Sequence, residues 1–441
     1  MHQTLFGRLP KTLIILVSAW ILMEIAVRIY LEWPLSTDFY SSLPADQITE
    51  YQKQIGVRAT TGKGWIHLGW IADPEREIYR IERATGDRWL YVRDVVFGSF
   101  LNHDGGKYRV WAHPKNGDEF RLIGEITVAP ESGIAPLYKP LIAGDWRTLL
   151  KPEKSGYYIN DHTIFQGKTG IWRLLGITSK SDGDFNAEKY FAVGVSEKFP
   201  PDSGMLETDP IADFGELAWA PHVIRADSVY HLFWSPHKLH QMTSVDGVNW
   251  TDHRITIPKP YHKFFRDAMV LQVDTNQWLL YTTARGGYFS EIDIYQSFNL
   301  ENWQYIGKAL DSSWGSERNA IFSSMESPFV VDYQNRFYLS LTYNNDSFFW
   351  PGILMLFHIW PDRASYNDTK VFQADNPYDF GIYRGENNSP SLVTNLTTHG
   401  PEIIHNPESD EWYITTAGWP WMASITSGEV AIAPLRWEFQ K

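Results

Sequence analysis

Three acidic residues stand in short motifs just ahead of apolar strands: Asp161 in IND, Asp267 in FRD and Glu326 in MES. Acids gathered in one place are costly, because like charges at short range raise each other's pKa and weaken folding. A fold that keeps such a cluster uses it for a metal or for acid–base work. Hydrolysis of a glycosidic bond needs a protonated acid for the leaving oxygen and a carboxylate for the anomeric centre or its water. The alternative is that each acid merely caps a turn.

A repeated unit would bring these acids together. It consists of a polar or Pro-containing triplet, an apolar strand, a short turn and an aromatic strand. The third triplet positions are 161, 221, 267, 327 and 401, with spacings of 46 to 74 residues, enough for a four-stranded sheet with loops. Five such units predict an all-β fold, a five-bladed β-propeller whose inner strands start near the axis, so that the triplets converge on one funnel. A sandwich of unrelated hairpins is the alternative.

The rest of the chain is arranged around this propeller, which we place at residues 151–441. Residues 60–150 lack the repeat but alternate like strands with Gly-Asp and Asn-Gly-Asp turns, which predicts an accessory β domain. Residues 32–59 would be a tether. Residues 1–31 contain an apolar run, Leu13–Leu31, of 19 residues. As a helix it would measure about 28 Å, close to the thickness of a bilayer core, so we expect an N-terminal transmembrane helix.

Charges on either side of this run predict its orientation. Arg8 and Lys11 precede it, and Glu32 follows it well before the next lysine, Lys53. The positive-inside rule therefore keeps the N-terminus in the cytoplasm and places the body of the protein outside, in a periplasmic or extracellular position. We favour a signal anchor. A cleaved signal peptide with Leu13–Met23 as its apolar core and a buried soluble helix are the alternatives.

Composition excludes several other classes of function. Lys and Arg number 39 against 52 Asp and Glu, so the net charge is −13 and no basic run offsets it. Binding of nucleic acid is therefore not expected, because phosphate backbones are repelled. The chain contains no cysteine, which excludes disulfides, zinc-thiolate sites and a thiol nucleophile.

The motifs resemble those of two glycosidase families. YINDHTIF, FRDAMV and MESPFV resemble the W-x-N-D-P-N-G, R-D-P and E-C-P motifs of glycoside hydrolase family 32, and WAPHV and HGPEI look equally like family 43. Both families belong to the five-bladed β-fructosidase and arabinanase superfamily. The resemblance implies that Asp161 is the nucleophile of a retaining enzyme or the base of an inverting one. It also implies that Asp267 stabilises the transition state or tunes the acid's pKa, and that Glu326 is the proton donor. Such a mechanism needs Glu326 kept protonated near neutral pH by the neighbouring acids and by partial burial, while Asp161 stays ionised.

Further residues near the triplets are candidates for contact with substrate. They are Asn160, His162, Trp219, His222, Arg266 and Trp419. His162 and His222 should flank the funnel mouth, although packing is the alternative for both. His399, in HGP, matches a fifth-blade histidine that in family 43 lies near an axial water or calcium ion. A structural calcium ion is therefore an expectation, and a hydrogen-bonded histidine at a strand end is the alternative.

These features together predict a membrane-anchored glycoside hydrolase that needs no cofactor and acts on an oligo- or polysaccharide. Fructosyl and arabinosyl substrates follow from the resemblance alone. The alternative is a non-catalytic propeller that binds glycans or scaffolds a surface assembly, and a lyase or other propeller enzyme is a third interpretation.

Overall fold

The computed structural model describes residues 44–117, 119–181, 184–211, 213–236, 238–253, 255, 265–286, 289–312, 324–344, 367–420 and 425–440. Regular structure in these ranges is almost entirely β-strand, which confirms the predicted all-β class. No helix within them is long and apolar enough to cross a membrane. The predicted transmembrane segment, Leu13–Leu31, lies outside the described residues.

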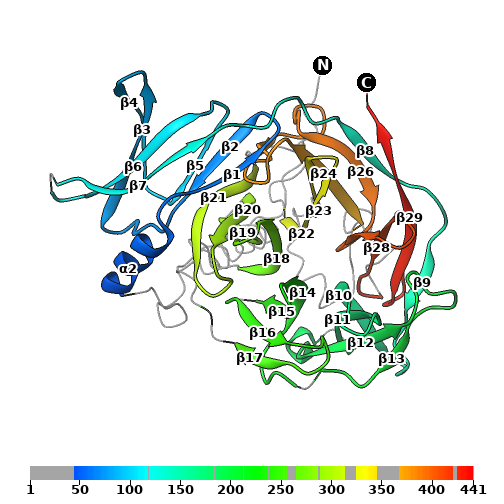
Figure 1. The fold of residues 1–441 in the computed structure, drawn as a ribbon. Coiled ribbons are helices and arrows are strands. Elements are labelled where there is room, and N and C mark those ends of the chain that lie inside the picture. Colours follow the sequence, from blue (N-terminus) through cyan, green and yellow to red (C-terminus); the bar gives the residue numbers. More distant parts are fainter. Residues whose placement is uncertain are drawn as a thin grey trace, which may run out of the picture.

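Five sheets stand around a common axis, which confirms the predicted propeller (Figure 1). The first is β10 (Tyr157–Gln166), β11 (Trp172–Lys180), β12 (Tyr190–Ser196) and β13 (Leu206–Thr208); the second is β14 (Trp219–Ala226), β15 (Val229–Ser235), β16 (His240–Ser244) and β17 (Thr251–His253). The third is β18 (Arg266–Asp274), β19 (Gln277–Gly286), β20 (Phe289–Ser297), β21 (Trp303–Ser312) and β25 (Ile382–Tyr383). The fourth is β22 (Ser324–Tyr333), β23 (Arg336–Asn344), β24 (Asp368–Ala374) and β26 (Leu392–Thr397).

Strands from both parts of the chain close the ring in the fifth sheet. It combines β27 (Ile403–Asn406), β28 (Glu411–Thr416) and β29 (Val430–Phe439) with β8 (Tyr138–Ile142) and β9 (Arg147–Leu150), which precede the first sheet. Both β8 and β9 pair with β29. The accessory domain was expected to extend to residue 150, but its last thirteen residues, 138–150, belong to this sheet of the propeller.

The turn between β22 and β23 is an example of the tight hairpins in these sheets. Between β22 and β23 the two turn residues Gln334 and Asn335 have φ of 56° and 63°, the paired left-handed conformation that a tight two-residue hairpin requires. The amide of Asn335 donates to Oδ1 of Asp332 at 3.0 Å and fixes the turn.

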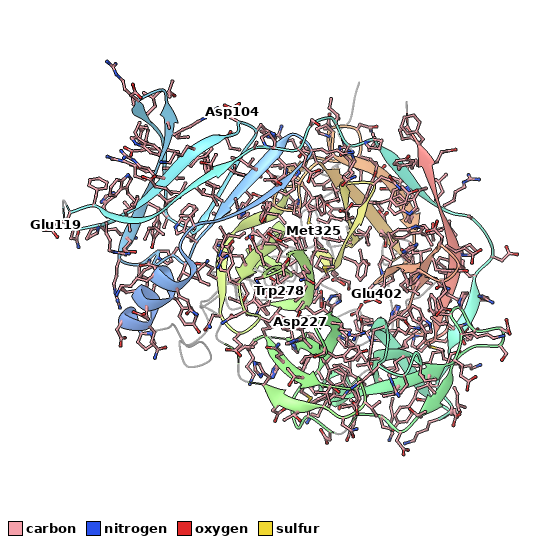
Figure 2. All side chains as sticks on the ribbon, in the orientation of Figure 1. Asp104, Glu119, Asp227, Trp278, Met325 and Glu402 are labelled. Carbon is pink, nitrogen blue, oxygen red and sulfur yellow. The ribbon has the colours of Figure 1, made fainter. Side chains whose placement is uncertain are left out.

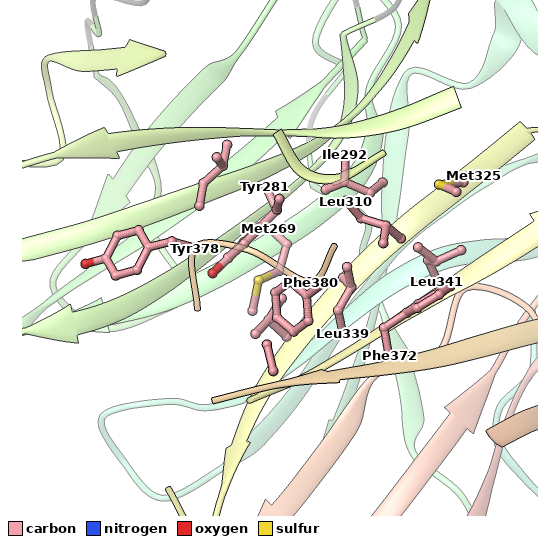
Figure 3. Close-up of a cluster of buried hydrophobic side chains, with 14 of the residues drawn as sticks. Met269, Tyr281, Ile292, Leu310, Met325, Leu339, Leu341, Phe372, Tyr378 and Phe380 are labelled. Carbon is pink, nitrogen blue, oxygen red and sulfur yellow. The ribbon is translucent and has the colours of Figure 1, made fainter. Parts of the chain in front are cut away.

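The main hydrophobic cluster lies between the third and fourth sheets (Figure 3). Its members come from the aromatic second strands and their neighbours, and include Tyr281, Met269, Leu339, Leu341 and Phe372. Each such side chain contributes about 1.5–3 kcal/mol by leaving water. Because neighbouring sheets cover both faces of each propeller sheet, its inner strands are apolar on both sides instead of alternating.

The accessory domain is a two-sheet sandwich. One sheet holds β1 (Arg58–Gly62), β2 (Trp65–Gly69) and β5 (Ser99–Asn102); the other has the order β4 (Arg88–Val95), β3 (Glu77–Thr85), β6 (Gly106–Pro114) and β7 (Arg121–Val128). Helix α2 (Ala45–Ile55) covers one end of it, where Gln52 donates to Glu77 at 2.9 Å. Part of the segment predicted to be a tether, residues 32–59, is therefore folded against this domain.

The sheet β1–β2–β5 packs on the third sheet of the propeller. Thr60 donates to Gln277 at 2.6 Å, and Gln296 donates to the carbonyl of Gly98 at 2.7 Å. The ring of His67 stacks on that of Tyr378 with centroids 3.8 Å apart. Burial lowers the pKa of His67 to about 3, so this histidine is neutral at the interface.

Candidate active site

A backbone irregularity recurs where the inner strand of each sheet begins. The pairing register shifts after Asn160, Trp219, Arg266 and Glu326. In the fifth sheet the amides of Ala417 and Thr415 donate to the carbonyls of His399 and Glu402, which leaves the same extra residue between two pairs. Such bulges re-aim a side chain at the end of a strand. Here they direct residues from all five sheets toward the axis.

The bulges also define which residues are equivalent. Four residues just after the shift have φ between 46° and 58°: Ala220, Asp267, Ser327 and Gly400. They correspond to Asp161 of the first sheet. The repeat alignment at 161, 221, 267, 327 and 401 is therefore wrong by one residue in the second and fifth units, because the proline of WAP and of HGP follows the bulge instead of occupying it.

The three predicted acids meet through two intermediaries, Ser327 and Arg266. The Ser327 hydroxyl donates to Oδ1 of Asp161 at 2.9 Å, and the Ser327 amide donates to Oδ2 of Asp267 at 3.1 Å. The guanidinium of Arg266 lies 3.1 Å from Oδ2 of Asp267 and 2.9 Å from Oε1 of Glu326. Carboxyl groups from the first, third and fourth sheets thus form one connected cluster, as the sequence predicts.

This cluster reaches the surface through some of its members. The side chain of Asp267 is 2% exposed, whereas those of Asp161, Glu326 and Arg266 are 14%, 19% and 20% exposed. Asp267 is therefore the buried support of the group. Asp161 and Glu326 are the acids that a ligand can reach.

Burial perturbs two of these acids. It raises the pKa of Asp161 to about 6, against the opposing hydrogen bond from Ser327, and the charge of Glu326 adds to the increase. Burial likewise raises the pKa of Asp267 to about 6, although the positive charge of Arg266 opposes it. Such perturbed acids in one cluster are typical of functional sites.

Glu326, the predicted proton donor, contacts Arg266, with Oε1 2.9 Å from the guanidinium. Its protonation near neutral pH stays a prediction. The sequence places Arg266 beside Asp267, but it did not predict that the same side chain would also reach the fourth sheet.

A small axial cavity of about 30 Å³ lies among the bulges, and residues of all five sheets line it. His222 and Glu402 face each other there, with Nδ1 and Oε1 3.8 Å apart. The other ring nitrogen of His222 lies 3.1 Å from the carbonyl of Val270, and Glu402 accepts from the amide of Ile164 at 2.9 Å. Figure 2 shows Glu402 on the inner side of the ring.

Both predicted mouth histidines are buried instead. His222 is 7% exposed and His162 is 4% exposed. A ring nitrogen of His162 lies 2.7 Å from the hydroxyl of Thr415, and burial lowers the pKa of His162 to about 3. Both residues also line the axial cavity, and their contact with substrate stays a prediction. Asn160 is buried as well, with 2% of its surface exposed.

A fourth acid, Glu188, lies beside the site and was not predicted. Its carboxylate accepts hydrogen bonds from the Tyr158 hydroxyl and, at 3.2 Å, from the indole of Trp419. Burial raises its pKa to about 7, against the hydrogen bonds from Tyr158 and Trp419. The charge of Asp161 adds a smaller increase, and the indole of Trp219 a smaller decrease. Trp419 and Trp219, two of the predicted substrate contacts and both partly exposed, are therefore grouped around one buried carboxyl. Glu188 stands in an irregular loop after η2 (Phe185–Ala187) and carries no motif.

His399 lies beside Asp161 of the first sheet. It is 2% exposed, and its Nε2 lies 3.9 Å from Oδ1 of Asp161. Its amide donates to the Thr416 hydroxyl at 3.0 Å. Within the described ranges no group of three or more His, Asp or Glu side chains is arranged to hold a metal, and the structural calcium ion stays a prediction.

Comparisons with known proteins give structural matches only. No family model and no curated protein matches the chain. A thermostable family-43 glycoside hydrolase is similar over 65% of this chain and 92% of its own, with 15% identity and a TM-score of 0.47. The family-32 β-fructofuranosidase BmSUC1 of Bombyx mori, solved as a mutant with sucrose, is similar over 64% of this chain and 62% of its own, with 12% identity and a TM-score of 0.46.

An exo-1,5-α-L-arabinanase from a bovine ruminal metagenomic library is also similar, over 63% of this chain and 92% of its own, with 10% identity and a TM-score of 0.42. Both glycosidase families named from the motifs thus occur among the structural matches.

Proposed function

We propose that this protein is a glycoside hydrolase whose active site is the cluster of Asp161, Asp267 and Glu326. The observation that supports it is the linkage of these acids through Ser327 and Arg266. Two acids are partly exposed and one is buried, which suits a pair that acts on the substrate and a third that supports them. A furanoside of the fructosyl or arabinosyl type is the proposed substrate class, on the basis of the motifs.

Hydrogen bonding distinguishes the roles of the acids. Oδ2 of Asp267 accepts from Thr283 at 3.0 Å, from the Ser327 amide and from Arg266. An oxygen held by three donors is poorly placed to attack, but a fixed negative charge stabilises an oxocarbenium-like transition state. Asp267 is therefore the electrostatic support.

Asp161 has one described hydrogen-bond donor, the Ser327 hydroxyl. Its second carboxylate oxygen is available to attack the anomeric carbon or to take a proton from water. Glu326 is the proton donor in this scheme. Its contact with Arg266 at 2.9 Å has to loosen when it gives its proton to the leaving oxygen.

We also propose that the propeller acts outside the cytoplasm, held to the membrane by Leu13–Leu31. The apolar length of this segment and the basic residues ahead of it support the proposal.

The test is release of sugar from a panel of fructans, arabinans and arabinoxylans. Asp161→Asn and Glu326→Gln should each lower the rate at least 10³-fold while the fold persists. Glu197→Gln, which changes an exposed acid in the bend that follows β12, should leave the rate unchanged. If the unmodified protein binds a glycan and cleaves none of the panel, the non-catalytic propeller is the better description.

A further inference from the structure

One face of the accessory sandwich points away from the propeller. The sheet β4–β3–β6–β7 uses Tyr79, Ile81, Tyr108 and Val110 to pack on the sheet β1–β2–β5, and that sheet lies on the propeller. The opposite face of β4–β3–β6–β7 is therefore the outermost layer (Figure 1). Figure 2 shows Glu119, in the β6–β7 hairpin, at the extreme of this side.

Aromatic rings and guanidinium groups alternate over this outer face. The guanidinium carbon of Arg109 lies 4.3 Å from the ring centroid of Trp89 and 5.0 Å from that of Trp111. The corresponding distances from Arg80 are 4.7 Å to Phe120 and 5.6 Å to Tyr91. Each cation thus bridges two rings from different segments and holds them in place. We call Trp89, Tyr91, Trp111 and Phe120 the aromatic platform.

Large apolar side chains of this face are exposed to an unusual degree. Tyr91 is 59% exposed, Phe120 44% and Leu122 43%. Single exposed apolar residues need no explanation, but a contiguous group on one face marks a binding surface. Rings that are already fixed lose little conformational entropy on binding.

The charges of this face are paired one to one. Arg80 lies 3.2 Å from Asp94 and Lys107 lies 2.7 Å from Glu125, and Arg109 is paired with Glu82. The face therefore offers no net field to an acidic or a basic macromolecule. It does offer hydrogen-bonding groups between flat apolar rings.

We propose that the aromatic platform binds a neutral polysaccharide chain. Sugar rings present apolar faces that stack on aromatic rings, and hydroxyl groups that bond to paired charges. Trp89 and Tyr91 are two residues apart in β4, about 6.8 Å along the strand, so one extended chain can lie on both. This proposal rests on the proposed function, since the aromatic platform would hold the polymer that the propeller cleaves.

The test is retention of the whole protein in native gels that contain arabinan, xylan or inulin. The unmodified protein should be retarded by at least one of these polymers. The double variant Trp89→Ala/Tyr91→Ala should bind that polymer at least tenfold more weakly. Leu206→Ala/Val245→Ala removes two apolar side chains that are 63% and 65% exposed on the propeller, and should change nothing. Unchanged retention of the platform variant, or no retention of the unmodified protein by any polymer, would refute the proposal.

Further measurements separate this proposal from the proposed function and from loss of folding. Asp161→Asn should abolish cleavage but keep retention, whereas the platform variant should cleave a small soluble arabinofuranoside or fructoside at the normal rate. Tyr91→Ala alone, at the most exposed ring, tests the platform if the double variant melts early. A dimer that the platform variant dissociates, with retention unaffected, would show that the face binds a second copy instead.

Discussion

The hydroxyl of Ser327 donates a hydrogen bond of 2.9 Å to Asp161, although 166 positions separate the two residues. The amide of the same serine binds Asp267. One residue of the fourth sheet therefore orients acids of the first and third, and it does so because its left-handed backbone, with φ of 50°, turns both donors toward the axis.

Replacing Ser327 by alanine should affect Asp161 more than Asp267, since the amide donor remains. In the unmodified protein the Ser327 hydroxyl lowers the pKa of Asp161. Its removal should therefore raise that pKa, shift the acidic limb of the kcat/KM profile to higher pH and reduce kcat about tenfold. Ser340→Ala, a buried serine of the adjacent strand β23, is the control. A profile that keeps its acidic limb in place would contradict this role.

Asp161→Asn should make the protein more stable at neutral pH while it abolishes activity. The pKa of Asp161 is raised from 3.8 to about 6 in the folded protein, so between these values the folded chain holds more protons than the unfolded chain. Stability therefore falls as the pH rises through this window, and an asparagine removes that loss. The Tm difference between variant and unmodified protein should be positive at pH 7 and vanish near pH 4.

Asp246→Asn should change the stability at pH 7 in the opposite direction to Asp161→Asn. The amides of Asn249 and Val248 and the side chain of Asn249 hold the pKa of Asp246 well below its usual range. This variant should lose stability at pH 7 and little at strongly acidic pH. If both variants shift Tm in the same direction at pH 7, the assignment of raised and lowered acids is wrong.

Arg266→Met should disrupt both stability and activity. It removes the cation between Asp267 and Glu326, and an uncompensated buried charge costs about 3–5 kcal/mol. Partial exposure of Arg266 and Glu326 reduces this figure. Urea unfolding should show a smaller deficit at pH 5 than at pH 7, because the acids then take up protons. An equal deficit at both pH values would indicate lost packing instead of lost charge.

Gly400→Ala should inactivate the protein by displacing Asp161. A Cβ at this position would lie 2.5 Å from Oδ1 of Asp161, and the residue has φ of 51°. Gly86→Ala is the matched control, because its φ is 59° and nothing lies within 4 Å of the added carbon. Both variants should lose about 1 kcal/mol of stability from backbone strain, but only Gly400→Ala should lose more than 10²-fold in kcat/KM.

Glu188→Ala should weaken substrate binding and leave the chemical step nearly intact. It removes the acceptor shared by the Tyr158 hydroxyl and the Trp419 indole, so Trp419 loses its fixed orientation. We expect KM to rise about tenfold with kcat within a factor of two, together with a shift in tryptophan fluorescence. Glu188→Gln keeps an acceptor and should restore most of the affinity. A loss confined to kcat would instead make Glu188 part of the acid–base machinery.

The ring of five sheets could be predicted because each unit repeats a triplet, an apolar strand and an aromatic strand. The convergence of the three acids could be predicted as well, because the inner strands of a propeller start at its axis. The register of two units could not be predicted, since the bulge at Ala220 and Gly400 is a backbone feature. The repeat was aligned on the prolines that follow these residues, which placed both units one residue too far along the chain. The roles of Ser327, Gly400 and Glu188 depend on contacts across sheets, which no local pattern encodes.

The pairing of β8 with β29 also escaped prediction, because Tyr138 and Phe439, aligned in that sheet, belong to opposite ends of the propeller sequence. It has a consequence for biosynthesis. A strand made early must remain unpaired until the ribosome has delivered the strand that receives it, so the ring of sheets can close only when translation of the propeller is almost finished.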